Sequence, residues 1–257
     1  MTPLNPIFRR PRWIFFDLDD TIWDFSSNSL KSLRFIFETT PEVQQAFPSL
    51  DAFLDEYHIH NAKMWEDFAA GLVTSDFIKT ERWRLTLWPE SDPDNTPARC
   101  SEINDAYLSK LASLPYPMPG ALELLGKLQK KYMIGALSNG FPDTQYKKLF
   151  NSGLSRYVAR IIVSGECGYQ KPDRRIFDYA VAETGAHGVP VLVGDNAKTD
   201  ILGALKAGWY AVWFTRDGAD FPYSKDFMIE NGIDPTLFLG TARSMAEVEP
   251  LLLLLDD

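Results

Sequence analysis

The chain has 257 residues and a formal net charge of −9, with 45% hydrophobic and 24% charged residues. This length is enough for one large domain or two smaller ones, and the composition is that of an ordinary globular protein. A mostly negative surface excludes a broad binding face for polymeric nucleic acid, which requires clustered lysine and arginine. An anionic substrate must therefore meet a local positive centre on this protein.

The cysteines and the two ends of the chain indicate its cellular setting. Cys100 and Cys167 are the only cysteines, and their spacing predicts neither a disulfide framework nor a zinc site. Residues 1–12 hold three prolines and three arginines, which is not the pattern of a signal peptide. The apolar run at residues 251–255 is far shorter than the roughly twenty residues that cross a bilayer. We expect a cytoplasmic protein with no membrane partner, and the oligomeric state stays open.

The first predicted element is a strand at residues 13–16. Its uninterrupted apolar run ends in acidic residues, which is typical of a parallel strand buried on both faces. From residue 25 to residue 114 the chain lacks β-branched runs. Its apolar residues recur instead at helical spacing, as at Leu30, Leu33 and Phe37. The sequence therefore predicts a helical insertion directly after the first strand.

Strands and helices alternate in the remainder of the chain. Further strands are predicted at residues 132–137, 157–163, 189–193 and 210–214. Helices are predicted between them over residues 120–128, 172–185 and 197–207, with proline at a start or glycine just past an end. This order predicts an α/β fold with a doubly wound parallel sheet. The core domain would comprise residues 1–24 and 115–257, and a helical cap domain would comprise residues 25–114.

Four short polar segments each follow a predicted strand or open the next helix. In an open parallel sheet, ligands bind outside the carboxyl ends of the strands, so these segments are expected to converge. Their carboxylates cannot all stay ionised at close range without a cation, and an all-oxygen site suits Mg²⁺. The segments are Asp17-Leu18-Asp19-Asp20-Thr21, Ser138-Asn139-Gly140, Lys171-Pro172-Asp173, and Gly194-Asp195-Asn196 with Asp200.

These residue types suit the transfer of a phosphoryl group. A carboxylate such as Asp17 can attack phosphorus and form an aspartyl-phosphate. A second carboxylate two residues on, Asp19, can protonate the leaving oxygen and later activate water. Ser138 and the backbone N–H groups after it can hold phosphoryl oxygens, and Lys171 adds a local positive charge. The predicted substrate is a small phosphate ester.

The order DxDxT, serine, Lys-Pro and GDN-x3-D resembles the four motifs of the haloacid dehalogenase-like hydrolases, over residues 12 to about 216. The resemblance implies a magnesium-dependent phosphatase with Asp17 as nucleophile and metal ligand. It makes Asp19 the general acid/base and a metal ligand through its carbonyl, and Asp195 a further metal ligand. It further implies phosphate binding by Ser138, Asn139 and Lys171. Thr21, Asn196 and Asp200 would have supporting roles, and Asp200 would support either Lys171 or the water shell of the metal.

The insertion resembles the cap of the bacterial 5′-nucleotidases within this superfamily. The similarity rests on the segment from Trp65 through Gly71, on Thr74-Ser75, and on the Ser-Asn-Gly-Phe form of the second motif. It implies a nucleoside 5′-monophosphate substrate, with a pyrimidine deoxynucleotide preferred. Trp65, Phe68 and Trp83 are candidates for the substrate pocket, although aromatic residues at helical spacing are usually core.

Other functions remain open at this stage. The phosphate ester could be a sugar phosphate or phosphoglycolate, since the core motifs grip only the phosphoryl group. A phosphomutase would use the same motifs with water excluded by the cap. A dehalogenase needs no leaving-group acid, and the presence of Asp19 disfavours it. An inactive binding scaffold is disfavoured because every motif residue is present.

Overall fold

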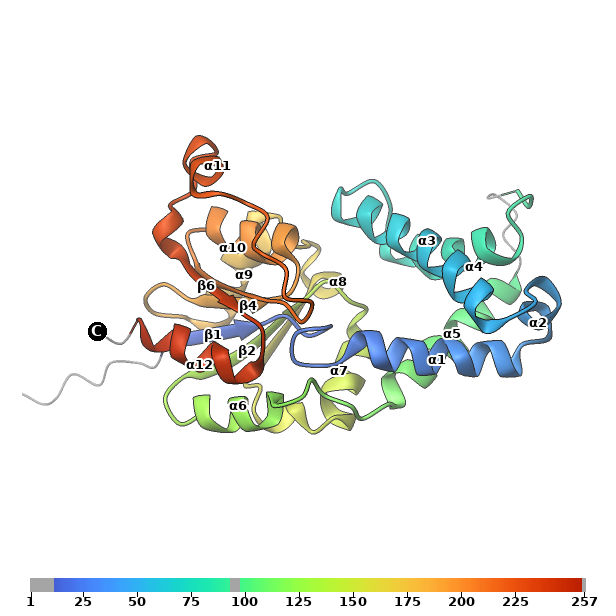
Figure 1. Ribbon diagram of the computed structural model, residues 1–257, viewed down its shortest axis with the longest axis horizontal. Helices are drawn as coiled ribbons and strands as arrows, with labels where there is room; N and C mark the ends of the chain where they lie inside the picture. The colour runs from blue at the N-terminus through green and yellow to red at the C-terminus, as the bar shows by residue number, and fades with distance from the viewer. Residues whose placement is uncertain (1–11, 93–97, 256–257) are drawn as a thin grey trace, which may run out of the picture.

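The computed structural model describes residues 12–92 and 98–255, so most of the segment used to exclude a signal peptide lies outside the described residues. Within this part a single sheet contains six parallel strands in the order β3-β2-β1-β4-β5-β6 (Figure 1). The strands are β1 (Trp13–Phe16), β2 (Met133–Ser138), β3 (Arg160–Val163), β4 (Val191–Gly194), β5 (Tyr210–Phe214) and β6 (Phe238–Ala242).

Helices account for most of the remaining described chain. Five helices follow β1 along the chain: α1 (Phe25–Thr39), α2 (Pro41–Ala46), α3 (Leu50–Ala69), α4 (Ser75–Leu87) and α5 (Ala98–Ser113). The others are α6 (Ala121–Leu128), α7 (Pro142–Asn151), α8 (Ser164–Cys167), α9 (Arg174–Thr184), α10 (Gly203–Lys206), α11 (Lys225–Glu230) and α12 (Met245–Leu253), with short 3₁₀ turns at Leu154–Arg156 and Pro235–Leu237.

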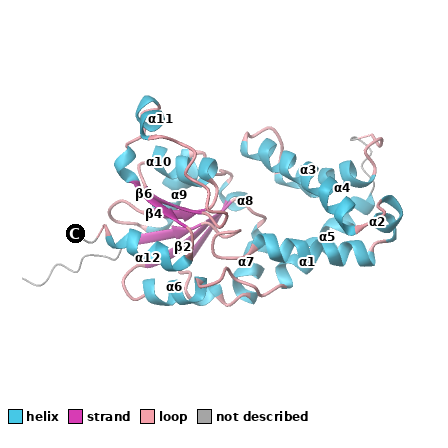
Figure 2. Ribbon diagram, viewed as in Figure 1, coloured by secondary structure: helices cyan, strands magenta, loops and turns pink. Residues whose placement is uncertain are grey.

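The sheet has helices on both faces, as Figure 2 shows. Successive residues of β1 point to opposite faces, so Ile14 and Phe16 join one buried cluster while Phe15 joins the other. Helices α6 and α12 complete the first cluster, and α9 and α10 complete the second. The prediction of a doubly wound parallel sheet is confirmed. In such a sheet, ligands bind in the crevice outside the carboxyl ends of the strands, where the functional groups are expected.

Helices α1 to α5 lie together beside the sheet rather than on it (Figure 1). Their starts are capped by side chains: Asp24, Ser49 and Thr74 accept a hydrogen bond from the backbone of α1, α3 and α4 respectively. The helices agree with the predicted helical insertion, while the division into two domains at residues 24 and 114 stays a prediction. No helix of the described residues is long and apolar enough to cross a membrane.

Several elements differ from the sequence-based expectation; helices α7, α8 and α11, for example, were not among the predicted helices. Strand β6 was not predicted. It is an edge strand whose short sequence includes Gly240 at a positive φ of 139°, so it lacks the apolar run of the buried strands. The helix expected over residues 197–207 begins as a π-helix at Ala197–Leu202 and continues as α10. The side chain of Asn196 accepts hydrogen bonds from Lys198 N and Thr199 N and so fixes this start.

Candidate active site

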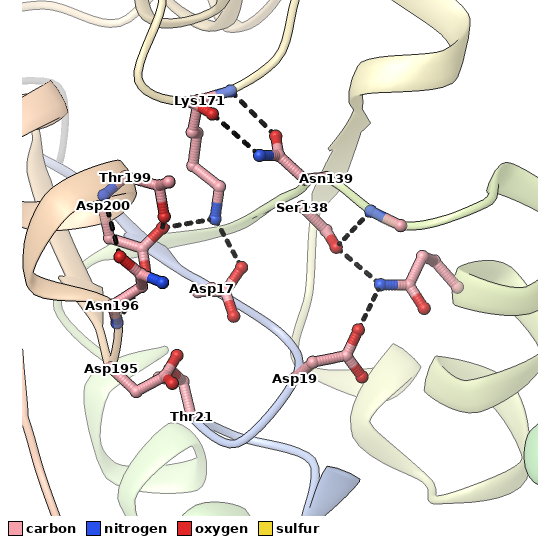
Figure 3. Close-up of polar contacts among 12 residues, drawn as sticks. Asp17, Asp19, Thr21, Ser138, Asn139, Lys171, Asp195, Asn196, Thr199 and Asp200 are labelled. Carbon is pink, nitrogen blue, oxygen red and sulfur yellow. Dashed lines mark hydrogen bonds and ion pairs between the residues drawn. The ribbon is translucent and has the colours of Figure 1, made fainter. Parts of the chain in front are cut away.

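Lys171 lies between two carboxylates at the carboxyl ends of the central strands (Figure 3). Its Nζ atom is 2.5 Å from Asp17 Oδ1 and 2.7 Å from Asp200 Oδ1. Only 2% of Lys171 is exposed, so this ammonium is held out of water and its charge is weakly screened. The site therefore contains the local positive centre that an anionic substrate of this acidic protein requires.

Asn139 holds Lys171 in place. Its amide nitrogen donates to Lys171 O at 2.9 Å, and its amide oxygen accepts from Lys171 N at 2.8 Å. Both polar atoms of the Asn139 side chain are thus engaged with backbone. These contacts let the side chain position Lys171, and one N–H of the amide is left to donate. The assignment of Asn139 to phosphate binding stays a prediction.

Asp195 and Asp200 complete an acidic group around Asp17. The three residues each offer an oxygen, and these oxygens all lie within 4.8 Å of one another. Thr21 Oγ1 donates to Asp195 Oδ1 at 3.2 Å, and the backbone N–H of Asn196 donates to Asp200 Oδ2 at 3.1 Å. Gly194 leaves room for this packing, because a Cβ there would lie 2.5 Å from an Asp200 oxygen.

Burial and mutual repulsion favour the protonated forms of Asp17 and Asp195. Burial raises the pKa of Asp17 to about 7 against the lowering effect of Lys171, and Asp200 and Asp19 add to the rise. Burial also raises the pKa of Asp195 well above its usual value, with Asp200 and Asp17 as further causes. The pKa of Lys171 would fall on burial, but the carboxylates of Asp17 and Asp200 raise it instead. The single positive charge of Lys171 does not balance the negative charges that Asp17, Asp195 and Asp200 would carry when ionised.

A divalent cation fits this arrangement. The donors are carboxylate oxygens, which Mg²⁺ prefers, and a cation would supply the positive charge that the raised pKa values call for. The carboxylate of Asp19 is not part of this group. That agrees with the expectation that Asp19 would reach a metal through its carbonyl, which stays a prediction.

Two residues that sequence reasoning missed hold the carboxylate of Asp19. Lys148 Nζ is 2.6 Å from Asp19 Oδ1, and Gln145 Nε2 donates to Asp19 Oδ2 at 2.8 Å. The Lys148 ammonium also lies 4.6 Å from the ring centroid of Trp23 and 5.3 Å from that of Phe25. These ring faces favour a cation at a position only 3% exposed. Their spacing of three on α7 places both on one helix face, but this spacing is common among polar helix residues and does not by itself indicate a site.

The hydroxyl proton of Ser138 has no acceptor among the described residues. Its Oγ accepts from Gln145 Nε2 at 2.5 Å and from Gly140 N at 3.2 Å. A hydroxyl has two acceptor sites and one donor, so the remaining proton can be donated to an oxygen of a bound phosphoryl group. Gly140 is required here, because a Cβ would approach Gln145 Nε2 to 2.3 Å.

A cavity of about 320 Å³ joins this cluster to the helical cap. Its walls include all the predicted site residues apart from Thr21 and Trp83. Trp65 and Phe68 line it from α3, as the sequence suggested. Trp83 does not; it is fully buried, with its ring centroid 4.9 Å from Tyr57 and 5.7 Å from Tyr107. Its role is in the core of the helical insertion.

Phe141 connects the segment that carries Ser138 to the cap. It follows Gly140 and precedes α7, and its ring packs in a cluster with Met64, Phe68 and Ile78. Its centroid is 5.5 Å from that of Trp65. A second link is made by Gln170, whose Nε2 donates to Phe68 O. The cap therefore rests on the two segments that carry Ser138 and Lys171.

Comparison with known proteins gives the family to which this site belongs. The model of the haloacid dehalogenase-like hydrolases matches residues 11–208. A solved structure with a similar fold is the HAD-hydrolase YfnB from Bacillus subtilis, bound to magnesium. It has a TM-score of 0.78 and 27% identity, and the match covers 95% of this chain and 99% of that one. The chain belongs to the haloacid dehalogenase-like hydrolases.

Two curated relatives narrow the reaction. Pyrimidine 5′-nucleotidase YjjG of Escherichia coli is 30% identical over 242 residues, which are 93% of this chain and 97% of that protein. Glyceraldehyde 3-phosphate phosphatase of Methanothermobacter thermautotrophicus is 32% identical over 226 residues, which are 87% of this chain and 93% of that protein. Together with the family match, these relatives make the protein a phosphatase of this family.

Proposed function

We propose that the protein hydrolyses nucleoside 5′-monophosphates, preferring pyrimidine deoxynucleotides, through an aspartyl-phosphate on Asp17. The observation that carries the proposal is one continuous cavity. A buried Asp17–Lys171–Asp200 group lies at one end, and the aromatic side chains of Trp65 and Phe68 line the cap side. The likeness to the nucleotidase YjjG over nearly the whole chain supports the same substrate class.

The proposed metal is Mg²⁺, held by Asp17, Asp195 and the carbonyl of Asp19. It would neutralise negative charge on the phosphoryl oxygens and on the acidic group. Asp200 pairs with Lys171 at 2.7 Å, so its proposed role is to hold that ammonium toward the substrate. Lys171 and the free proton of Ser138 would then bind phosphoryl oxygens from two sides of the site.

In the first half of the proposed reaction, an oxygen of Asp17 bonds to phosphorus while the bond from phosphorus to the leaving oxygen breaks. Asp19 gives its proton to that leaving oxygen, and the free alcohol, here a nucleoside, departs. In the second half the carboxylate of Asp19 takes a proton from water. The water oxygen bonds to phosphorus, the bond to Asp17 breaks, and inorganic phosphate leaves with both aspartates restored.

Selection of the leaving group would fall to the cap, because the residues proposed to bind the phosphoryl group are the same for any phosphate ester. The ring of Trp65 lies at the cavity wall and could stack on a flat base. Stacking of this kind is worth about 1–3 kcal/mol in single-strand binding proteins, whereas a sugar phosphate offers no matching face. A cytoplasmic setting, where nucleotides are found, remains part of the proposal.

The test is steady-state kinetics with Mg²⁺ on a matched panel of nucleoside monophosphates, hexose phosphates, glyceraldehyde 3-phosphate and phosphoglycolate. The proposal expects the highest kcat/KM for a pyrimidine deoxynucleotide. Trp65→Leu should lower that value about tenfold, in line with the stacking energy. The control Phe77→Leu changes a 40%-exposed cap ring that does not line the cavity. A non-nucleotide with a tenfold higher kcat/KM would refute the nucleotidase and leave the phosphatase.

A further inference from the structure

Arg82 places a buried guanidinium in the cap wall of the cavity. It belongs to α4, is 2% exposed and lines the same cavity as Asp17. Its Nη1 donates to Asn61 Oδ1 at 3.0 Å and its Nη2 donates to Asn104 Oδ1 at 2.7 Å. Its Nε has no hydrogen-bond partner among the described residues. A buried donor of this kind is costly unless something pairs with it.

The surroundings of Arg82 are neutral. Among the described residues it takes part in no ion pair, and both acceptors of its Nη1 and Nη2 hydrogen bonds are amide oxygens. Its guanidinium carbon lies within 5.2 to 6.0 Å of the ring centroids of Tyr57, Trp83, Tyr107 and Phe141. Aromatic faces attract a cation, so the positive charge is stabilised without a carboxylate. A neutral acceptor is therefore enough to complete the site.

This part of the wall offers donors. Arg82 has no acceptor atom, so the oxygen of Asn61 must face it, and that oxygen also accepts from Tyr57 OH at 3.5 Å. The amide nitrogen of Asn61, itself a cavity-lining residue, is left to donate elsewhere. The hydroxyl of Tyr107 is paired with Ser29 Oγ at 2.8 Å. A ligand group that lies against Arg82 and Asn61 must bring acceptor oxygens.

We propose that Arg82 and Asn61 form a recognition site for a carbonyl oxygen of the leaving group. The inference rests on the proposed function, in which that oxygen is the 2-carbonyl of a pyrimidine base. Every pyrimidine nucleotide carries this carbonyl beside the bond from base to sugar, and adenine has none. Guanine carries its carbonyl at the far edge of a larger ring system. The site thus accounts for selection of pyrimidines over purines, which stacking alone does not provide.

Two matched variants test the site. Asn61→Asp preserves size and the contact to Arg82 but replaces the free amide donor by an acceptor. Asn104→Asp is the matched control, because Asn104 accepts a hydrogen bond from the other terminal nitrogen of the Arg82 guanidinium. Asn104 is 1% exposed and does not line the cavity. The substrates are dUMP, dAMP and 2-deoxyribose 5-phosphate, which has no base. The measured quantity is the ratio of kcat/KM for dUMP to that for 2-deoxyribose 5-phosphate.

Asn61→Asp should lower this ratio about 10- to 100-fold, as expected for loss of a hydrogen bond to a buried polar group and its replacement by repulsion. Asn104→Asp should preserve it within about threefold. Arg82→Lys retains the charge and loses the planar fork, so it should also lower the ratio. Thermal unfolding of each variant identifies those that fold.

The two proposals fail differently. A wild-type enzyme that does not prefer dUMP to 2-deoxyribose 5-phosphate refutes the nucleotidase function. A wild-type preference for dUMP that survives in folded Asn61→Asp and Arg82→Lys refutes the carbonyl site alone. A ratio that falls equally in Asn61→Asp and Asn104→Asp also refutes it, because the effect would then come from added charge beside Arg82 rather than from the lost donor.

Discussion

Replacing Lys148 by methionine should slow turnover by acting through Asp19. Methionine has nearly the length of lysine and suits the faces of Trp23 and Phe25, so the packing is largely retained. The lost contact is the 2.6 Å ion pair with Asp19. A hydrogen bond to a charged group contributes about 1.5–3 kcal/mol, and the lower part of that range applies because Gln145 still holds Asp19 at 2.8 Å.

A loss of about 1.5–2 kcal/mol from the positioning of the acid/base corresponds to a fall of about 10- to 30-fold in kcat. KM should change little, because Lys148 does not belong to the phosphate-binding group around Lys171. Lys148→Arg retains the positive charge and should recover part of the rate. Steady-state kinetics on the preferred substrate with Mg²⁺ measures these values.

A double-mutant cycle separates this reasoning from a general structural effect. Asp19→Asn alone should lower the rate about a hundred- to ten-thousand-fold, as loss of a general acid/base does, while the substrate still binds. If Lys148 acts through Asp19, adding Lys148→Met to Asp19→Asn should cost no further rate. Additive losses, or a kcat for Lys148→Met that equals or exceeds the wild-type value, would refute the positioning role.

The remaining predictions concern Asp17 and the metal. Asp17→Asn should abolish turnover with the fold intact, because an amide cannot attack phosphorus; phosphate release near the wild-type rate by a folded variant would contradict the mechanism. Activity should require Mg²⁺ and be inhibited by Ca²⁺, whose longer distances and higher coordination let both oxygens of Asp17 bind and misplace it; full activity in excess chelator would rule this out. In chelator, the free energy of unfolding should fall as the pH rises from about 4 to 7. The pKa of Asp17 is raised from 3.8 to about 7 in the folded state, so that state holds the extra proton across this range. Thermal unfolding should show a shallower pH slope in Asp17→Asn, and an equal slope would contradict the assignment.

The convergence of the candidate site residues was predictable because its signals are local. Asp17, Ser138 and Asp195 each stand at or just past the end of a buried strand, and parallel topology brings such ends together. Lys171 was identified by its place before a helix predicted to open at Pro172; in the structure this helix, α9, begins at Arg174 with Asp173 as its N-cap. The order of these segments along the chain was enough to assign the family and the sheet. None of this required knowledge of side-chain partners.

The further side chains that surround these site residues were not predictable from one sequence. Gln145, Lys148 and Arg82 are ordinary polar residues of helices, and nothing next to them in the chain marks them as buried. Their roles arise only when a helix is docked against another element. Trp83 shows the same limit in reverse. Its helical spacing fits both pocket and core, and packing against Tyr57 and Tyr107 decides for the core.

The position of Phe141 has a consequence for how the cap and the reaction communicate. Its backbone continues directly from Ser138 through Gly140, while its ring is inserted among side chains of α3 and α4. Any tilt of the cap that moves those helices must pull on the turn that presents the serine hydroxyl. If the cap closes over a bound leaving group, the same motion would move the Ser138 hydroxyl proposed to bind the phosphoryl group. Substitutions of Met64, Phe68 or Ile78, the cap residues packed around Phe141, should therefore alter kcat as well as KM.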